Sequence, residues 1–443
     1  MKISRHLLLA CLILALLNLH SFAQPLNTAK LDSLFNALAS KEMAMGSVAI
    51  SKNGVLLYKK AIGYSYIDHF VKTAANTRTK YKIGSESKMF TAVMIFQLIE
   101  EHKISLDQKL ANWFPQLPNA NKITIRMLLL HRSGLHNYTA DDTHFPEWMD
   151  KPTTHEQLLK IIQDHRPDFE PDAKADYCNT NYLLLSYIIE KIDKASYATA
   201  LENRIVSKIG LHSTYYGQRS KVSNNESVSY KNDKNSWATQ KETDPGIHSG
   251  AGAIVSCPAD MAVFITALFN GKLVSMKSLD TMKTMVDGYG MGMFPFDHDG
   301  YGHNGRIEEF YSALRYYPAE KLAVSYITNG IIYPRTDILA GIEKICFNEP
   351  YAIPFAVSIQ PTTSEFDKYT GKYASEDIPI KVNCTKEGAR LLLETRGTVF
   401  EVTPVAVNYF MHAPTGTFFE FFPATGELQI KETDNVYYLK KEK

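Results

Sequence analysis

The sequence predicts an α/β sandwich with an inserted helical subdomain, followed by a C-terminal antiparallel β domain. Three observations lead to this fold class. Two pairs of β-like segments lie far apart in the chain, the region between them is rich in helical patterns, and short strand-like segments dominate after residue 362. At 443 residues, the chain is also longer than a single hydrophobic core usually serves, so more than one domain is expected.

The first pair of strands is predicted at Gly46–Ser51 and Val55–Ile62, with Asn53-Gly54 between them. Asn and Gly both accept positive φ, which favours a tight hairpin at this point. Before the hairpin, residues 27–43 carry four apolar side chains at helical spacing, namely Leu31, Leu34, Phe35 and Leu38.

The second pair of strands is predicted at Tyr311–Tyr317 and Leu322–Thr328, with a turn at Pro318-Ala319 and a helix at about 334–347. We expect both hairpins to join one antiparallel sheet. The first and last helices would then cover one face of it.

The middle of the chain, residues 89–270, has helical patterns connected by long polar loops, among them Asn224–Asp244. The apolar periodicity predicts helices at Phe90–His102, His155–Asp164, Tyr182–Ile192 and Pro258–Leu268. A cleft between a sheet-based part and a helical part is a natural place for a binding site.

Residues 362–443 contain short β-like segments separated by Gly, Asn, Pro and Thr. They are Ile378–Val382, Leu391–Leu393, Val399–Val402, Phe418–Phe422, Glu427–Ile430 and Tyr437–Leu439. Such spacing predicts a small antiparallel barrel or sandwich. We therefore expect a first domain at 24–350, a linker at 351–361 and the β domain at 362–443.

The N-terminal residues have the pattern of a signal peptide. Lys2 and Arg5 precede the apolar stretch Leu7–Leu19, and the small residues of Ser21-Phe22-Ala23 follow. This pattern predicts cleavage after Ala23 and a secreted or periplasmic protein. A retained anchor is the alternative, but the stretch is shorter than the roughly 20 apolar residues that a span needs. We expect no membrane span in the mature chain.

The composition excludes a strongly charged binding surface. The formal net charge is +1, and removal of residues 1–23 takes away one Lys, one Arg and no acidic residue, which leaves −1. No strong field remains to attract nucleic acid or an anionic membrane, so the expected partner is a small-molecule or peptide substrate. The oligomeric state stays open. The four remaining cysteines form no CxxC pair, and both buried thiols and disulfides stay open.

The sharpest local pattern is Ser85-Glu86-Ser87-Lys88 at the start of an apolar helix. Residues three apart on a helix face the same side, so Lys88 can reach Ser85. A partly desolvated lysine can lose its charge and remove the proton of a serine hydroxyl. The unpaired N–H groups of a helix N-terminus suit an oxyanion that forms beside Ser85. The alternative is a capping serine with a solvated lysine.

Two further elements are compatible with acyl transfer. In an extended Tyr177-Cys178-Asn179 segment, Tyr177 and Asn179 point the same way, as a proton shuttle and an orienting amide would require. In His303-Asn304-Gly305, the glycine would let a substrate backbone lie against the next strand. The alternatives are a capping Asn with a packed Tyr, and a glycine-rich turn with a surface histidine.

The order SxxK, YxN, HxG resembles the serine β-lactamase and penicillin-binding-protein superfamily, on the branch that includes class C β-lactamases. The segments that carry this resemblance are Ile83–Thr91, Leu128–Leu135, Asn181–Leu185, and Gly250–Gly252 followed by Asp260. The resemblance extends over roughly residues 27–345. It implies a β-lactamase or transpeptidase-like fold for this part of the chain and no cofactor.

The resemblance also implies a role for each motif residue. Ser85 would be acylated, with Lys88 as its base, alone or together with Tyr177. Asn179 would orient Lys88 and the substrate. The third motif would contribute the substrate-facing residues His303, Asn304, Gly305 and Arg306.

The N–H groups of Ser85 and Arg306 would form the oxyanion hole, and His303 and Asn304 would line the far wall. His131, Ser133 and Gly134 are expected to be structural, with buried hydrogen bonds. A metal site at Asp297-His298-Asp299 with His303 is disfavoured, because no zinc-binding spacing accompanies these residues.

One departure from the superfamily affects the expected substrate. Classical members carry Lys-Thr-Gly where this chain has His303-Asn304-Gly305, and a neutral histidine supplies less charge for a substrate carboxylate. We therefore expect a serine hydrolase that forms an acyl-enzyme with an ester, amide or D-peptide, in the manner of an esterase, DD-peptidase or D-aminopeptidase. The alternatives are a class C-type β-lactamase and a penicillin-binding sensor that acylates without turnover.

Overall fold

The computed structural model describes residues 26–68, 70–140, 145–233, 236–355, 363–433 and 435–442. The expected signal peptide, residues 1–23, and residues 356–361 of the expected linker lie outside this part. Within it, no helix has the length and apolar character needed to cross a membrane. The expected domain boundaries stay a prediction.

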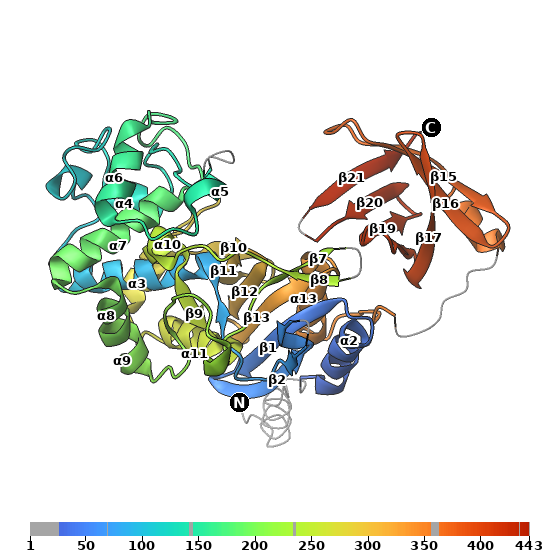
Figure 1. Ribbon diagram of the computed structural model, residues 1–443, viewed down its shortest axis with the longest axis horizontal. Coiled ribbons are helices and arrows are strands. Elements are labelled where there is room, and N and C mark those ends of the chain that lie inside the picture. The colour runs from blue at the N-terminus through green and yellow to red at the C-terminus, as the bar shows by residue number, and fades with distance from the viewer. Residues whose placement is uncertain are drawn as a thin grey trace, which may run out of the picture.

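The centre of the first unit is a six-stranded antiparallel sheet (Figure 1). Both predicted hairpins belong to it. Its strands, in spatial order, are β10 (Phe294–Phe296), β11 (Gly300–Ile307), β12 (Phe310–Tyr317), β13 (Leu322–Ile331), β1 (Ala44–Lys52) and β2 (Val55–Ile62). β1 pairs with β13, which joins the two hairpins into one sheet. The expected α/β fold class is thereby confirmed.

Two terminal helices cover one face of this sheet, also as predicted. They are α2 (Thr28–Ser40) and α13 (Arg335–Cys346). Leu34 and Phe35 of α2 share one hydrophobic cluster with Ile338 of α13 and with Val48 of β1. Helix α11 (Pro258–Phe269) contacts β1, β12 and β13 from the helical side. The central strands β12 and β13 are therefore buried along their whole length.

The helical subdomain is built around α3 (Ser87–Glu100), whose residues 87–98 are all buried. Around it lie α7 (Asn179–Asp193) and α10 (Pro245–Gly252), both of which contact α3. The smaller helices include α4 (Ile125–Leu129), α5 (Phe145–Trp148), α6 (His155–Asp164), α8 (Tyr197–Leu201), α9 (Ser207–Ile209) and α12 (Met276–Met282). Figure 1 shows this subdomain beside the end of the sheet where β10 and β11 lie.

Several strands were not predicted from the sequence. The segment 224–244, predicted as a loop, contains the hairpin of β7 (Tyr230–Asp233) and β8 (Ser236–Thr239). Trp237 and Tyr230 stabilise it by packing in a small cluster with Met45. Apart from β11, the remaining missed strands of this unit are very short: β3 (Tyr64–Ile67), β4 (Lys72–Ala74), β5 (Tyr81–Lys82), β6 (Tyr215–Tyr216), β9 (Ile254–Ser256) and β10 (Phe294–Phe296). Strands of two to four residues carry too little alternation to be recognised.

The C-terminal unit is a closed eight-stranded antiparallel barrel, which decides between the barrel and the sandwich. Its strands are β14 (Gly371–Ala374), β15 (Lys381–Glu387), β16 (Arg390–Thr395), β17 (Thr398–Ala406), β18 (Tyr409–His412), β19 (Thr417–Phe422), β20 (Glu427–Lys431) and β21 (Val436–Lys441). β14 and β18 were not predicted. The strand predicted at Ile378–Val382 was misplaced, because pairing with β14 begins only at Lys381.

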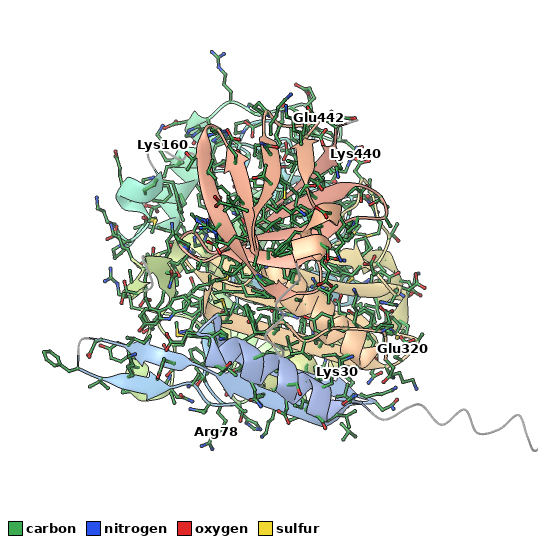
Figure 2. All side chains as sticks on the ribbon, turned by 90° about the vertical axis from the view of Figure 1, so that its right-hand side faces the viewer. Lys30, Arg78, Lys160, Glu320, Lys440 and Glu442 are labelled. Carbon is green, nitrogen blue, oxygen red and sulfur yellow. The ribbon has the colours of Figure 1, made fainter. Side chains whose placement is uncertain are left out.

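The barrel is joined to the first unit by buried contacts. Val405, Tyr409 and Phe418 of the barrel belong to the same hydrophobic cluster as α2 and α13. Figure 2, seen from the barrel side, shows the barrel above Lys30 of α2, with Lys440 and Glu442 at the barrel's upper end. The described cysteines, Cys178, Cys257, Cys346 and Cys384, are all free thiols.

Candidate active site

Ser85 lies in a short 3-10 turn, Gly84–Glu86, directly before α3. Gly84 has φ +51°, and a Cβ there would approach the backbone N of Arg306 to 2.8 Å. A Cβ on Gly305 would come within 2.0 Å of the carbonyl oxygen of Ile83. Both positions therefore require glycine, and the Ser85 turn packs backbone to backbone against β11. This packing brings the Arg306 peptide to the Ser85 turn, as the expected oxyanion hole needs.

Lys88 is fully buried in the first turn of α3 and contacts three oxygen atoms. Its Nζ lies 3.0 Å from Ser85 Oγ, 2.8 Å from Asn179 Oδ1 and 2.8 Å from the carbonyl oxygen of Ala251. Burial holds the pKa of Lys88 well below its usual value. A neutral amine has two N–H groups and one lone pair. In the neutral form of Lys88, the two carbonyl oxygens would take both N–H groups, and the lone pair would be free to accept the hydrogen of the Ser85 hydroxyl.

Tyr177 lies on the other side of this pair. Lys88 Nζ is 4.8 Å from the centre of the Tyr177 ring. Burial raises the pKa of Tyr177, while a hydrogen bond with Ser85 lowers it to a smaller extent. Tyr177 is therefore protonated at neutral pH and lies within reach of the Ser85 hydroxyl. This arrangement meets the requirement for a proton shuttle.

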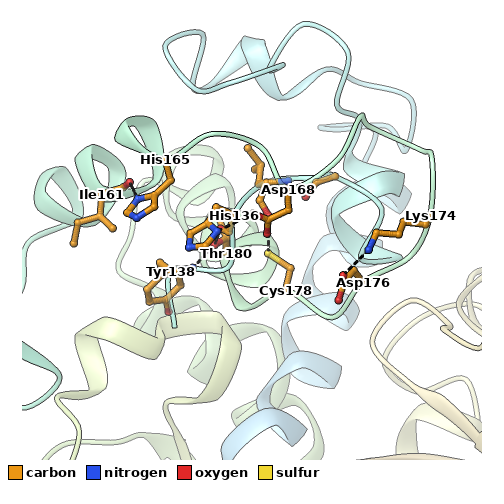
Figure 3. A network of polar contacts seen from close by, with 11 residues as sticks. His136, Tyr138, Ile161, His165, Asp168, Lys174, Asp176, Cys178 and Thr180 are labelled. Atoms are coloured by element: carbon orange, nitrogen blue, oxygen red, sulfur yellow. Dashed lines mark hydrogen bonds and ion pairs between the residues drawn. The ribbon is translucent and has the colours of Figure 1, made fainter. Parts of the chain in front are cut away.

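The Tyr177-Cys178-Asn179 segment is held by hydrogen bonds to the segment 131–137. His131 Nδ1 accepts the N–H of Cys178 at 3.0 Å, and the His131 ring packs 4.6 Å from that of Tyr177. The Cys178 thiol donates to the carbonyl oxygen of Leu135. Figure 3 shows the neighbouring bonds around His136, whose carbonyl accepts from Thr180 at 2.6 Å. His131 thus has the buried hydrogen-bonding role that the sequence predicts.

Ser133 and Asn181 form a buried polar pair behind this segment, and this pair is also structural in character. Ser133 Oγ donates to Asn181 Oδ1 at 2.6 Å and accepts the N–H of Leu135 at 3.1 Å. His136 Nδ1 lies 2.9 Å from Asp168 Oδ1, and the ring of His136 stacks on that of His165 (Figure 3). These contacts fix the segment that follows α4 against the start of α7, which carries Asn179, rather than the cleft itself.

The third motif lies within strand β11, which was not predicted because three glycines in Gly300–Ile307 weaken the strand pattern. His303 is only 2% exposed, and its ring centre lies 6.4 Å from that of Tyr177. Burial lowers the pKa of His303 to about 3. The histidine is therefore neutral at pH 7, as we expected for the residue that replaces the lysine of Lys-Thr-Gly.

Arg315 on β12 holds this motif in place and was missed in the sequence. Its Nη2 donates to Asn304 Oδ1 at 2.7 Å, and its Nη1 donates to the carbonyl oxygen of His303 at 3.2 Å. The guanidinium is buried and packs over the ring of Phe296 at 3.4 Å. The Asn304 amide therefore faces a buried cation. A lone arginine in an apolar strand gives no signal of such a contact.

Glu86, the residue after Ser85, is a fully buried carboxyl group. Among the described residues, neither of its oxygens has a hydrogen-bond partner. Burial raises the pKa of Glu86 to about 8, and the smaller effects of Ser312 and Arg315 oppose this rise. The side chain is therefore an uncharged acid at neutral pH.

Glu86→Gln is expected to change how stability depends on pH. The unfolded chain ionises Glu86 above about pH 4.5 and the folded chain only near pH 8. The contribution of Glu86 to the free energy of unfolding is therefore greatest below about pH 4.5. This contribution is lost as the pH rises to about 8. Glutamine cannot ionise, so the melting temperature of Glu86→Gln relative to wild type should rise between pH 5 and 8. Exposed Glu156→Gln is the control, and parallel curves for wild type and Glu86→Gln would contradict this assignment.

The cleft beside Ser85 has a volume of about 520 Å³. Of the predicted residues, Ser85, Asn179 and Arg306 line it. The residues that sequence reasoning missed are Thr139, Phe145, Met149, Thr243, His248, Ala251, Gly252, Ile307 and Glu308. They come from α5, α10, the end of β11 and separate loops, so no single local pattern could have brought them together.

An ion-pair cluster supports one wall of the cleft. Lys82 Nζ lies 3.0 Å from Glu242 Oε2 and 3.6 Å from Glu308 Oε2. Glu308 Oε1 also accepts the N–H of Thr243 at 2.6 Å. Burial raises the pKa of Glu308. The cluster fixes the turn between β11 and β12, which follows Arg306.

The residues considered for a metal site do not lie together. His298 stacks on Phe347 at 3.9 Å, and its Nε2 lies 3.4 Å from Glu349. His303 is instead buried against Phe294. In the part of the chain that the structure describes, no three His, Cys, Asp or Glu side chains form a group that could hold a metal ion.

Residues 31–337 match the family model described as Beta-lactamase. The chain belongs to the β-lactamase family. As a member of that family it is a serine hydrolase that acts by acyl transfer.

The relatives of this β-lactamase-family chain include a protein named as a penicillin-binding protein and one named as a hydrolase. Penicillin-binding protein 4* of Bacillus subtilis (strain 168) is 26% identical, over 86% of this chain and 91% of that protein. Teichoic acid D-alanine hydrolase of Staphylococcus aureus (strain MRSA252) is 30% identical, over 56% of this chain. This match spans 57% of the hydrolase's length.

Solved structures extend the comparison. A D-stereospecific amidohydrolase from Streptomyces sp. is 26% identical, with a TM-score of 0.61, over 72% of this chain and 98% of that chain. The octameric penicillin-binding protein homologue from Pyrococcus abyssi has a TM-score of 0.67 and covers 94% of this chain and all of that one. At 21% identity, this second likeness shows the fold alone.

Proposed function

We propose that the protein hydrolyses an ester or amide bond on the carbonyl side of a D-amino-acid residue, through an acyl-enzyme on Ser85. One observation carries the proposal: the buried Lys88 Nζ lies 3.0 Å from Ser85 Oγ and also contacts Asn179 Oδ1 and the carbonyl oxygen of Ala251. The preference for a D residue is supported by the relatives named as a D-alanine hydrolase and a D-stereospecific amidohydrolase. The N-terminal pattern supports action outside the cytoplasm.

Acylation would begin when Lys88 accepts the proton of Ser85. The freed Oγ attacks the substrate carbonyl carbon, and the N–H groups of Ser85 and Arg306 bind the resulting oxyanion. Tyr177 passes the proton to the leaving nitrogen or oxygen as its bond to carbon breaks.

Deacylation would use the same groups in reverse. Lys88 and Tyr177 remove a proton from water, which attacks the acyl carbon. The bond from that carbon to Ser85 Oγ then breaks, and the oxygen takes the proton back. No additional reactant is needed.

β-lactamase activity is the alternative, and the third motif weighs against it. A β-lactam presents a carboxylate, which a lysine would bind with a charge-assisted hydrogen bond. His303 is neutral and buried. The guanidinium of Arg306 lies 5.0 Å over the ring of Tyr311 and 3.8 Å from Glu309, so existing contacts hold this nearby cation.

We expect measurable hydrolysis of D-alanine p-nitroanilide and of short-chain p-nitrophenyl esters, with weak or absent turnover of nitrocefin. The measurement is kcat/KM for each substrate, with L-alanine p-nitroanilide as the stereochemical control. A nitrocefin value above about 10⁵ M⁻¹s⁻¹, in the range of efficient enzymes, would restore the β-lactamase alternative. A burst of product without turnover on every substrate would instead favour the penicillin-binding sensor.

A further inference from the structure

A second cavity lies next to the cleft, between the barrel and the first unit. It has a volume of about 490 Å³, similar to that of the cleft. The first unit contributes Arg306, Glu309 and Lys231, and the barrel contributes the β18–β19 turn at 413–416 and residues near Thr433. We call this cavity the interdomain groove. Arg306 lines both the groove and the cleft, so both cavities border this residue.

The groove lies on the side of the substrate's acyl group. Tyr177 must reach the leaving group to protonate it, and the His303 end of β11 faces Tyr177. The leaving group therefore lies toward His303. The acyl group must then extend the opposite way along β11, past Arg306, where the groove begins.

The groove is formed by a barrel that is fixed in place. The hydroxyl of Tyr409 donates to Asp337, and Lys431 Nζ donates to Asp337 Oδ1 at 2.8 Å. The N–H of Arg335 donates to the carbonyl oxygen of Thr433 at 3.2 Å. Lys431 is 9% exposed at its side chain, so the ion pair is shielded from solvent. The groove therefore exists before a ligand binds, which lowers the entropic cost of binding.

The lining of the groove suits a polar chain without a large net charge. Lys231 and Arg306 are balanced by Glu309 and Glu432. The other polar side chains carry amides and hydroxyls, which both donate and accept hydrogen bonds: Asn232, Tyr311, Thr415, Thr433 and Asn435. Peptide groups offer one donor and one acceptor for each residue, which matches this lining.

We infer that the interdomain groove is a second substrate subsite, which binds the peptide chain attached to the amine of the D residue whose carbonyl Ser85 attacks. This inference rests on the proposed function and adds the length and chemistry of the acyl group to it. The barrel supplies binding surface and no catalytic group. Remote contacts of this kind raise kcat/KM when their binding energy is retained in the transition state.

The test compares a short and a long substrate with the same leaving group: acetyl-D-alanine p-nitroanilide and an N-acetylated pentapeptide p-nitroanilide that ends in D-alanine. In the wild type, kcat/KM should be at least about tenfold higher for the long substrate, because the groove adds binding energy. Ala413→Trp fills the groove from an exposed position of the β18–β19 turn. This substitution should bring the long-to-short ratio to about one.

The matched control is Ala424→Trp. Ala424 is exposed in the β19–β20 turn, at the opposite end of the barrel, where it does not line the groove. This variant should keep the wild-type ratio. Equal rates on both substrates in the wild type, or an unchanged ratio in Ala413→Trp, would overturn the inference.

A binding measurement separates this inference from the proposed function. Fluorescence anisotropy with Ser85→Ala protein would follow a labelled pentapeptide amide that ends in D-alanine. Ala413→Trp in this background should weaken binding at least about tenfold, and Ala424→Trp should not. Peptide binding at the groove without hydrolysis of either anilide would refute the proposed function alone. Absence of binding would refute the assignment of the interdomain groove as a peptide-binding subsite.

Discussion

Ser85→Ala is expected to lose covalent labelling by a fluorophosphonate and nearly all hydrolysis. The wild-type protein should gain the mass of the probe on the peptide that contains Ser85. Without the hydroxyl no acyl-enzyme can form, so kcat/KM should fall by about four to six orders of magnitude. Intact mass spectrometry followed by peptide mapping measures the label, and ester hydrolysis measures the rate.

Ser207→Ala is a suitable control for this experiment, because Ser207 is an exposed serine outside the cleft. It should label and react like the wild type. Labelling that persists in Ser85→Ala at another residue would show that the nucleophile lies elsewhere, and the proposed mechanism would have to be abandoned.

Lys88→Ala and Tyr177→Phe are each expected to lower kcat/KM by about two to four orders of magnitude. Lys88→Ala removes the amine that accepts the Ser85 proton. Tyr177→Phe keeps the ring that packs on His131 and removes only the hydroxyl. Because burial keeps the pKa of Lys88 well below its usual value, wild-type activity should not require the strongly alkaline pH at which a solvated lysine loses its proton.

The two variants should remain folded, as circular dichroism would establish. Lys88 is fully buried, so its alanine variant leaves a cavity, and Lys88→Met provides a variant of similar length without the amine. A comparable loss in Lys88→Met with native stability would assign the effect to proton transfer. Losses below about tenfold in Tyr177→Phe and Lys88→Met would place the base at another residue.

The sequence reveals only those parts of the site that a local pattern encodes. Ser85 and Lys88 follow from helical spacing, because three residues bring them to the same face. The partnership of Lys88 with Asn179 joins positions 91 residues apart, which only the family resemblance could suggest. Ala251, Arg315 and Glu308 act through contacts that depend on the assembled fold, although Ala251 lies in the Gly250–Gly252 segment that carries the family resemblance.

The same limit applies to the fold. The hairpin at Asn53-Gly54 and the amphipathic helix α2 are local, and both were predicted. Strand β11 forms because β12 pairs with it along seven positions, although its glycines disfavour a strand. Closure of the barrel depends on the pairing of β14 with β21, at Tyr373 with Lys441 and at Ala374 with Lys440. Pairing between strands that are far apart in the chain leaves no local periodic pattern in the sequence from which it could be predicted.

The pairing of β1 with β13 has a consequence for how the protein reaches its native state. Lys52 pairs with Leu322, 270 positions later. Bringing such distant segments together lowers the entropy of the chain before stabilising contacts can form. Folds dominated by such contacts therefore form slowly. The edge of the first hairpin therefore stays unpaired until almost the whole catalytic unit is available to fold with it. We expect folding to be slower than that of a helical bundle of equal size, with exposure to aggregation through that edge for the same period.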